Sequence, residues 1–372
     1  MNGARQLRQL RKKHSMRLDQ LRQRMKTDNL DILVITKELD MEYLCGIQCS
    51  SGMLFVLSEQ AVLLTDYRYA AQARDTAPCL TVVDMAEDPV SPYATATRLA
   101  ALFTNPRIGA DAQRDLLGQL APGAEVVPAG DIIVGMRAVK DQEEIQRIKG
   151  ACEITGQAYL EMLCWLKPGM TEREVAIRLE HFMKTAGADQ PMAYNIVVAS
   201  GHRSAYAHAR ATHKVIEASD VVLLDFGCKF EGYCSDLSRT VVMGSASKEQ
   251  LRVYKTIQNA RHACIDLLAP GVDSALIDRT AQQVCADAGY LSQYGRGVGH
   301  GVGLSVAEAP VMLDAPGFAA SAPIPRNAVV TIEPAIYLEG FFGMRLEDVF
   351  LVTDHGAQQL GDTHGDLIQL GY

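Results

Sequence analysis

Two aspartates interrupt apolar runs that otherwise predict buried β-strands, and this placement limits how the chain can fold. Asp225 lies within the run Val221–Phe226, and Asp236 lies within the run Tyr233–Val242. The segment 229–232 between them has turn character, so a hairpin would bring the two aspartates side by side. Buried carboxylates repel each other and lose hydration, so the fold must place positive charge beside them.

A second pair of acidic residues repeats this arrangement near the end of the sequence. Glu333 lies in the apolar run 331–337, Glu347 lies in the segment 343–352, and Gly340 is midway between them. A hairpin centred on Gly340 would therefore pair the two glutamates. Four clustered carboxylates need more than one lysine or arginine for balance, so divalent cations are the expected partners.

A glycine-rich segment supplies a nitrogen donor of the kind that such a site would use. His300 lies in the segment 297–304, where every second residue is glycine, and glycine allows a close approach of the backbone. Each feature alone is more often structural than functional, so the combination carries the prediction. Four carboxylates and one imidazole suit two divalent ions such as Mn²⁺, Co²⁺ or Fe²⁺, with Zn²⁺ less favoured. The candidate metal-binding residues are Asp225, Asp236, His300, Glu333 and Glu347.

The composition is that of a globular protein. Apolar residues make up 48% of the 372 residues and charged residues 22%, and no apolar run approaches the ~18 residues of a membrane span. The basic segment 1–17 is not followed by the apolar stretch of a signal peptide, so we expect a cytoplasmic protein without a membrane partner. The net charge of −8 argues against a nucleic-acid partner.

The nine cysteines show no disulfide or zinc pattern, because their number is odd and no Cys-x-x-Cys pair occurs. Several lie in apolar surroundings on predicted helices, where buried free thiols are expected. These are Cys152, Cys164, Cys264 and Cys285.

The order of helical and strand-like patterns predicts two domains. A helix over 5–28 and strands over 31–36, 51–57 and 60–65 predict an α/β domain, residues 1–135. Residues 136–372 predict an α+β domain. Its helices are expected over 141–166, after the capping sequence Thr171–Glu174, and over 248–268 and 273–289. Its strands are expected over 195–199, 221–226, 240–243, 329–332 and 349–352.

These motifs, in this order, resemble the creatinase/prolidase/aminopeptidase P family. The resemblance rests on two aspartates eleven residues apart, followed by Gly-His-Gly-Val-Gly-Leu, Glu-Pro-x-Ile-Tyr and Arg-x-Glu-Asp. The segments 31–34, 43–46 and 64–69 are similar to the creatinase-type N-terminal domain of that family. The resemblance implies an α/β N-terminal domain, an α+β catalytic domain with the "pita-bread" fold, and a homodimer. It also implies that a metal-bridging hydroxide cleaves the N-terminal Xaa-Pro bond of dipeptides or short peptides.

The resemblance also implies a role for each site residue. Asp225 would bind one ion, His300 and Glu333 the other, and Asp236 and Glu347 would bridge them. Glu333 would act as the general base as well.

Two further residues receive catalytic roles from the resemblance. His208 would donate a hydrogen bond to the developing oxyanion, and Arg345 would steady Glu347. His202 and His213 are expected to be solvated loop residues.

The chain departs from the family pattern at Ala307, where the family usually has a second histidine that contacts substrate. No predicted metal ligand is lost. A metal-dependent amide hydrolase or lyase acting on small metabolites therefore remains an alternative, since one fold can carry several reactions. A non-enzymatic binding module is a third reading, and metal content would distinguish it from the other two.

Overall fold

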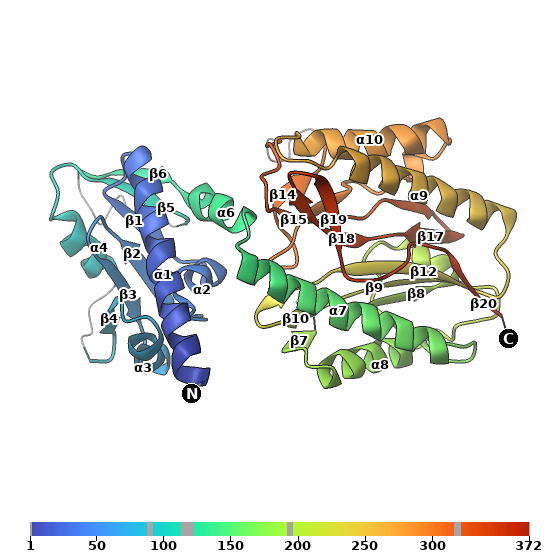
Figure 1. Ribbon diagram of the computed structural model, residues 1–372, viewed down its shortest axis with the longest axis horizontal. Helices are drawn as coiled ribbons and strands as arrows, with labels where there is room; N and C mark the ends of the chain where they lie inside the picture. The colour runs from blue at the N-terminus through green and yellow to red at the C-terminus, as the bar shows by residue number, and fades with distance from the viewer. Residues whose placement is uncertain (1, 88–91, 113–122, 192–195, 316–320, 372) are drawn as a thin grey trace. The chain divides into compact units, whose positions relative to one another are not determined.

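Two units make up the chain, residues 1–137 and residues 138–372 (Figure 1). The computed structural model describes residues 2–87, 92–112, 123–191, 196–315 and 321–371. The domain boundary predicted after residue 135 falls inside helix α6 (Gly130–Ala138) and stays a prediction.

The first unit is built on one six-stranded sheet in the order β4-β3-β2-β1-β5-β6. The strands β1, β2 and β3 pair antiparallel, and the other three join in parallel pairs, as expected of a mixed α/β domain. The predicted helix and three predicted strands of this unit are confirmed. Its elements are α1 (Asn2–Thr27), β1 (Ile32–Ile35), α2 (Glu38–Cys45), β2 (Gly52–Val56), β3 (Ala61–Thr65), α3 (Tyr67–Thr76), β4 (Thr81–Asp84), α4 (Pro92–Ala100), β5 (Arg107–Ala110), β6 (Glu125–Pro128) and α6.

The second unit contains the helices and strands predicted for it, although Asn195, in the first predicted strand, lies outside the described residues. Its helical elements are α7 (Gln142–Trp165), α8 (Glu172–Thr185), η1 (Gly201–Ala205), α9 (Lys248–Leu267), α10 (Ser274–Asp287) and η2 (Leu291–Gln293). Its strands are β7 (Gln190–Pro191), β8 (Val197–Ser200), β9 (Val221–Phe226), β10 (Cys228–Phe230), β11 (Tyr233–Cys234), β12 (Leu237–Met243), β13 (Gly299–Gly301), β14 (Glu308–Met312), β15 (Val329–Ile332), β16 (Ala335–Leu338), β17 (Phe342–Arg345), β18 (Asp348–Thr353), β19 (Gly356–Leu360) and β20 (Ile368–Leu370).

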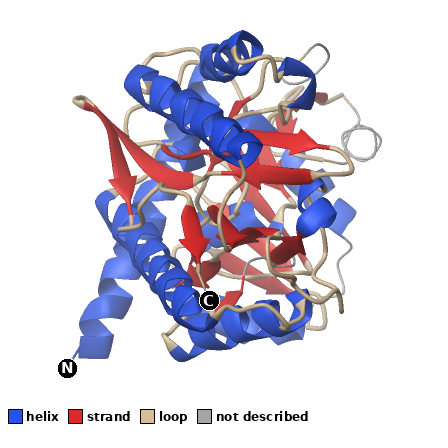
Figure 2. Cartoon of the chain, turned by 90° about the vertical axis from the view of Figure 1, so that its right-hand side faces the viewer, coloured by secondary structure: helices blue, strands red, loops and turns tan. Residues whose placement is uncertain are grey.

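The strands of the second unit lie between two pairs of helices, α7 with α8 and α9 with α10 (Figures 1 and 2). Each pair covers its own apolar core. Val222 and Leu224 of β9 pack in the core of α7 and α8, whereas Val221 and Val242 pack in the core of α9 and α10. Successive residues of a strand point to opposite faces, so these central strands are apolar on both faces and leave few places for a charge.

The first carboxylate hairpin forms with a different register from the expected one. Asp225 of β9 lies opposite Ser238 of β12, and Asp236 precedes that strand. The two aspartates therefore share a face but lie diagonally, two positions apart, rather than directly opposite. The cause is the position of the turn: β10 and β11 continue the same ladder to a turn centred between Glu231 and Gly232, which have φ of 47° and 82°, one residue beyond the midpoint of the two aspartates.

The second carboxylate hairpin has the expected centre. In the β16–β17 ladder Ala335 pairs with Arg345, and in the β15–β18 ladder Ile332 pairs with Asp348. The two ladders share the same register. Glu333 and Glu347, which lie between the two ladders, are therefore opposite each other. The turn contains Gly340 at φ 79°, a conformation that glycine adopts without strain.

The expectation of buried free thiols has a mixed outcome. Cys152, Cys264 and Cys285 are buried free thiols as predicted, but Cys164 is exposed because it lies on the outer face of α7.

Within the described ranges, no helix has both the length and the apolar character needed to cross a membrane.

The predicted cap of α8 forms, and its removal should lower stability. Glu174 N–H donates to Thr171 Oγ1 at 3.2 Å, and Thr171 N–H donates to Glu174 Oε2 at 2.7 Å. We expect Thr171→Ala to reduce the free energy of unfolding by about 1 kcal/mol in urea denaturation. Thr185→Ala, at the exposed last residue of the same helix, should change it by less than about 0.5 kcal/mol. Equal effects of the two substitutions would contradict the capping role.

Candidate metal centre

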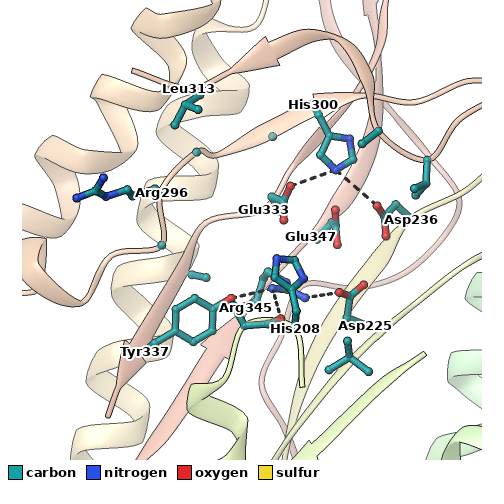
Figure 3. Close-up of a pocket in the computed structure, with 18 of the residues that line it drawn as sticks. His208, Asp225, Asp236, Arg296, His300, Leu313, Glu333, Tyr337, Arg345 and Glu347 are labelled. Atoms are coloured by element: carbon teal, nitrogen blue, oxygen red, sulfur yellow. Dashed lines mark hydrogen bonds and ion pairs between the residues drawn. The ribbon is translucent and has the colours of Figure 1, made fainter. Parts of the chain in front are cut away.

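Three side chains of the predicted metal site converge in the second unit. The ligand atoms of Asp236, His300 and Glu347 all lie within 4.8 Å of one another. Glu333 adjoins them, with its Oε1 atom 3.4 Å from His300 Nε2, and Asp236 Oδ2 lies 3.7 Å from the same nitrogen (Figure 3). The structure thus brings four of the five predicted ligands together, three carboxylates and the imidazole of His300.

The orientation of His300 leaves this nitrogen free to act as a ligand. His300 Nδ1 lies 3.1 Å from the carbonyl oxygen of Gly301. A carbonyl can only accept, so this hydrogen bond places the proton on Nδ1 and the lone pair on Nε2. His300 N–H also donates to Thr331 Oγ1 at 3.1 Å, which fixes the backbone from which the ring extends.

Asp225 lies beside Arg345 rather than beside His300. The Arg345 guanidinium forms an ion pair with Asp225, and both side chains are only 5% exposed. The expectation that Arg345 steadies Glu347 stays a prediction, and the structure offers an indirect route for it. Arg345 reaches Glu347 through Ser238, because Arg345 Nε donates to Ser238 Oγ at 2.7 Å and this hydroxyl donates to Glu347 Oε2 at 2.7 Å.

A buried arginine behind the site joins the two carboxylate hairpins. Arg239, fully buried, donates to the carbonyl oxygens of Ser238 and Glu347 at 2.9 and 2.6 Å. Arg239 Nη2 donates to Asp348 Oδ1 at 2.5 Å, and Arg261 Nη2 donates to Asp348 Oδ2 at 2.6 Å. Asp348 is thus balanced by two cations, whereas its neighbour Glu347 is not.

The charge around Glu347 is unbalanced. Burial, followed by the nearby carboxylates of Asp236, Glu333 and Asp225, raises the pKa of Glu347 well above its ordinary value. Among the residues that the structure describes, no hydrogen-bond partner reaches its buried Oε1 atom. An acceptor of this kind costs free energy unless a donor or a cation meets it. The side chains therefore fit divalent cations, whose preferred ligands are carboxylate oxygens and imidazole.

A cavity of about 770 Å³ opens onto these residues and contains the other predicted catalytic side chains. His208, which is exposed, and Arg345 line it together with the carboxylates. Ala307 lines it as well, so the position of the missing histidine faces the same space. Such a cavity has room for a small peptide.

Two residues of the site were not predicted from the sequence. Ser238 and Arg239 follow Asp236 closely and lie in an apolar strand, which is an unusual place for a buried arginine. That placement was a usable signal of a buried polar network. Tyr337 was noted only as part of a motif, yet its hydroxyl accepts from Arg345 Nη1 at 2.7 Å.

Comparison with protein families finds a match over both units. The model of metallopeptidase family M24 matches residues 146–354, and that of the creatinase/prolidase N-terminal domain matches residues 17–139. An Xaa-Pro dipeptidase of Pyrococcus furiosus is 36% identical over 238 residues, which is 64% of this chain and 67% of the relative.

Solved structures are similar over nearly the whole chain. An Xaa-Pro dipeptidase from Bacillus anthracis has a TM-score of 0.87 at 28% identity and covers 96% of this chain and 100% of its own. An X-Pro aminopeptidase from Thermotoga maritima has a TM-score of 0.84 at 30% identity, with coverages of 95% and 99%. The predicted fold, a creatinase-type α/β domain followed by a pita-bread catalytic domain, is confirmed.

Cation binding to this centre should depend on Asp236. We expect Mn²⁺ at about 100 times its Kd to raise the free energy of unfolding by about 2.7 kcal/mol, and more if both ions bind. Asp236→Ala should remove the stabilisation by Mn²⁺ and the heat of binding measured by titration calorimetry. Asp354→Ala changes an exposed aspartate paired with Arg326 and should leave both unchanged. Normal Mn²⁺ binding by Asp236→Ala would contradict the site.

Proposed function

This chain belongs to metallopeptidase family M24, and on that premise we propose that it cleaves the bond between an N-terminal residue and a following proline. The substrates are dipeptides or short peptides. One observation carries the proposal: the ligand atoms of Asp236, His300 and Glu347 converge within 4.8 Å beside a cavity that can admit a peptide. The printed activities of the similar proteins, an Xaa-Pro dipeptidase and an X-Pro aminopeptidase, support the choice of bond.

In this proposal two divalent ions occupy the carboxylate centre, Mn²⁺ or Co²⁺ in preference to Fe²⁺ or Zn²⁺. When bound, they supply a nucleophile at neutral pH by lowering the pKa of water. The residues that hold them are Asp225, Asp236, His300, Glu333 and Glu347. Asp236 and Glu347 lie centrally in the group and are suited to contact both ions.

Glu333 is the proposed general base. Its side chain is 22% exposed, so its carboxylate is open to the cavity, unlike the 2% exposed side chain of Asp236. Glu333 takes the proton of the attacking water and delivers it to the proline nitrogen as the C–N bond breaks. Its Thr331 neighbour, whose hydroxyl lies 3.5 Å from Glu333 Oε1, limits how the carboxylate can turn.

His208 and Arg345 act on the substrate side and the metal side of the same centre. His208 lines the cavity on the segment after η1 and can donate to the carbonyl oxygen as negative charge develops there. Arg345 holds Asp225 through its ion pair and is itself held by Tyr337 and Ala207 O, at 2.7 and 3.3 Å. We further propose that the enzyme is a cytoplasmic homodimer.

A second candidate follows from Ala307. Because this residue lines the cavity at the position where the family pattern has a histidine, the pocket lacks one donor for a peptide. A metal-dependent amide hydrolase or lyase acting on a small metabolite would use the same carboxylate centre without that donor.

The test of the proposed function is peptide turnover by metal-stripped protein before and after Mn²⁺ or Co²⁺ is added. We expect cleavage of Ala-Pro, Leu-Pro and Ala-Pro-Ala only with metal, because the cations generate the nucleophile. The preferred length distinguishes a dipeptidase from an aminopeptidase. Metal binding without cleavage of any of these peptides would contradict the proposal and favour the second candidate.

The role of His208 predicts a loss of rate without a loss of metal. We expect His208→Ala to lower kcat by about 10²–10³, as for removal of an oxyanion donor, with metal binding unchanged. His202→Ala is the matched control, because His202 is an exposed histidine on η1 that does not line the cavity. A kcat for His208→Ala equal to that of the control would exclude the role.

A further inference from the structure

The end of the cavity remote from the carboxylates is formed by two irregular segments. Arg296 lies on segment 294–297, before β13, and Leu313 follows β14; both line the cavity. Figure 3 shows them on the side away from Asp236 and Asp225. A substrate with its scissile bond at the carboxylates would extend towards this end.

The segment that carries Arg296 is attached to the hairpin of the catalytic residues. Tyr294 forms an isolated bridge with Ile336 of β16, and Gly295 N–H donates to Ala335 O at 3.0 Å. A Cβ atom on Gly295 would lie 3.2 Å from the ring of Tyr337, so the segment packs closely on the cavity wall. Small movements of this segment therefore move the wall itself.

One buried carboxylate on α10 joins both segments. Asp278, fully buried, accepts from the Tyr294 hydroxyl through Oδ1 at 2.8 Å. Its other oxygen accepts from Asp314 N–H at 2.8 Å and from Gln282 Nε2 at 2.9 Å. Tyr294 is two residues before Arg296, and Asp314 directly follows Leu313.

The chemistry of this junction makes it a fixed connection. Asp278 interrupts the apolar face of α10, where Ile277, Ala281 and Cys285 pack in the core. Burial, followed by the adjacent Asp278, raises the pKa of Tyr294 far above its ordinary value, so its hydroxyl keeps the proton that it donates. A buried acceptor with three donors resists displacement, because each lost partner leaves a desolvated group unpaired.

The groups that this junction positions are suited to the distal part of a peptide. The Arg296 guanidinium has no hydrogen-bond or ion-pair partner in the part of the chain that the structure describes, and its planar donors match a carboxylate. Leu313 offers apolar surface beside it. A short peptide has both features after its scissile bond, an apolar proline ring and a terminal carboxylate.

We infer that Asp278 is a positioning residue that sets the spacing of Arg296 and Leu313, and so controls binding of the substrate's carboxyl end. The inference rests on the proposed function for its substrate. Loss of the Asp278 contacts should therefore raise KM. Metal binding should be unchanged, because the proposed metal ligands lie on other elements.

The matched pair Asp278→Asn and Asp287→Asn tests this. Both substitutions change an aspartate of α10 whose carboxylate accepts a hydrogen bond from a glutamine one helical turn away. Asp287, however, is exposed, and among the described residues its side chain bonds only Gln283, whose Nε2 lies 2.8 Å from Asp287 Oδ1. An asparagine at 278 loses one of two acceptor oxygens. We expect Asp278→Asn to raise KM for Ala-Pro about tenfold or more, with kcat within about threefold and Mn²⁺ binding unchanged.

Two comparisons identify the route of the effect. In an Arg296→Ala background, Asp278→Asn should raise KM by less than about twofold, because coupled residues are not additive. The increase should also be smaller for Ala-Pro amide, which lacks the terminal carboxylate. A tenfold rise that persists in both comparisons would overturn the role assigned to Arg296.

Hydrogen exchange tests the junction without any activity. Asp278→Asn should speed amide exchange in residues 291–298 and 311–315, and Asp287→Asn should not. If Asp278→Asn fails to fold, Tyr294→Phe replaces it in this experiment, because it removes only the hydroxyl that donates to Asp278. Unchanged exchange and unchanged KM would overturn the inference. If the wild-type protein cleaves no peptide, the proposed function fails, and so does the substrate role of Arg296 and Leu313. Hydrogen exchange would still decide whether Asp278 holds the two segments.

Discussion

The contact between Ser238 and Glu347 joins the two hairpins on which the site depends. Glu347 N–H donates to Ser238 O at 3.1 Å, and the Ser238 hydroxyl returns a bond to Glu347 Oε2 at 2.7 Å. This pairing places the acids of one hairpin against those of the other, although more than a hundred residues separate them. Arg239 bonds the carbonyl oxygens of both residues, so the junction is held from behind as well.

At this junction a carboxylate that is neutralised by arginines lies next to one that is not. Asp348 is met by Arg239 and Arg261, whereas Glu347, one residue earlier, is met directly by no cation among the described side chains. Of the acids in the cluster, Asp225 has the Arg345 ion pair. A chain that can neutralise one buried acid with two arginines has the means to neutralise its neighbour. The excess negative charge is therefore best understood as a site for cations, supported by two apolar cores on either side.

The sequence predicted the parts of this centre that follow from strand periodicity. Spacing about Gly340 was enough to place Glu333 opposite Glu347, because a two-stranded ladder has one register once its turn is known. The same reasoning failed for Asp225 and Asp236, since the turn of their hairpin is centred between Glu231 and Gly232, one residue beyond the midpoint of the two aspartates. The ion pair of Arg345 with Asp225 could not be predicted from the sequence, where Arg345 was linked only to its neighbour Glu347, which it reaches through Ser238.

Contacts between distant residues lay beyond sequence reasoning. Asp278 is a polar residue on a predicted helix, which ordinarily indicates a solvated face, and nothing local shows that Tyr294 and Asp314 reach it. The residue patterns supplied the five candidate ligands, the family resemblance added His208, Arg345 and a role for each residue, and the geometry supplied their connections.

A crystal structure of the protein soaked with Mn²⁺, with anomalous data collected near the manganese edge, decides whether the carboxylate cluster holds two cations. We expect two separate anomalous peaks within the group formed by Asp225, Asp236, His300, Glu333 and Glu347. A single peak, or no peak, with the carboxylates in place would contradict it.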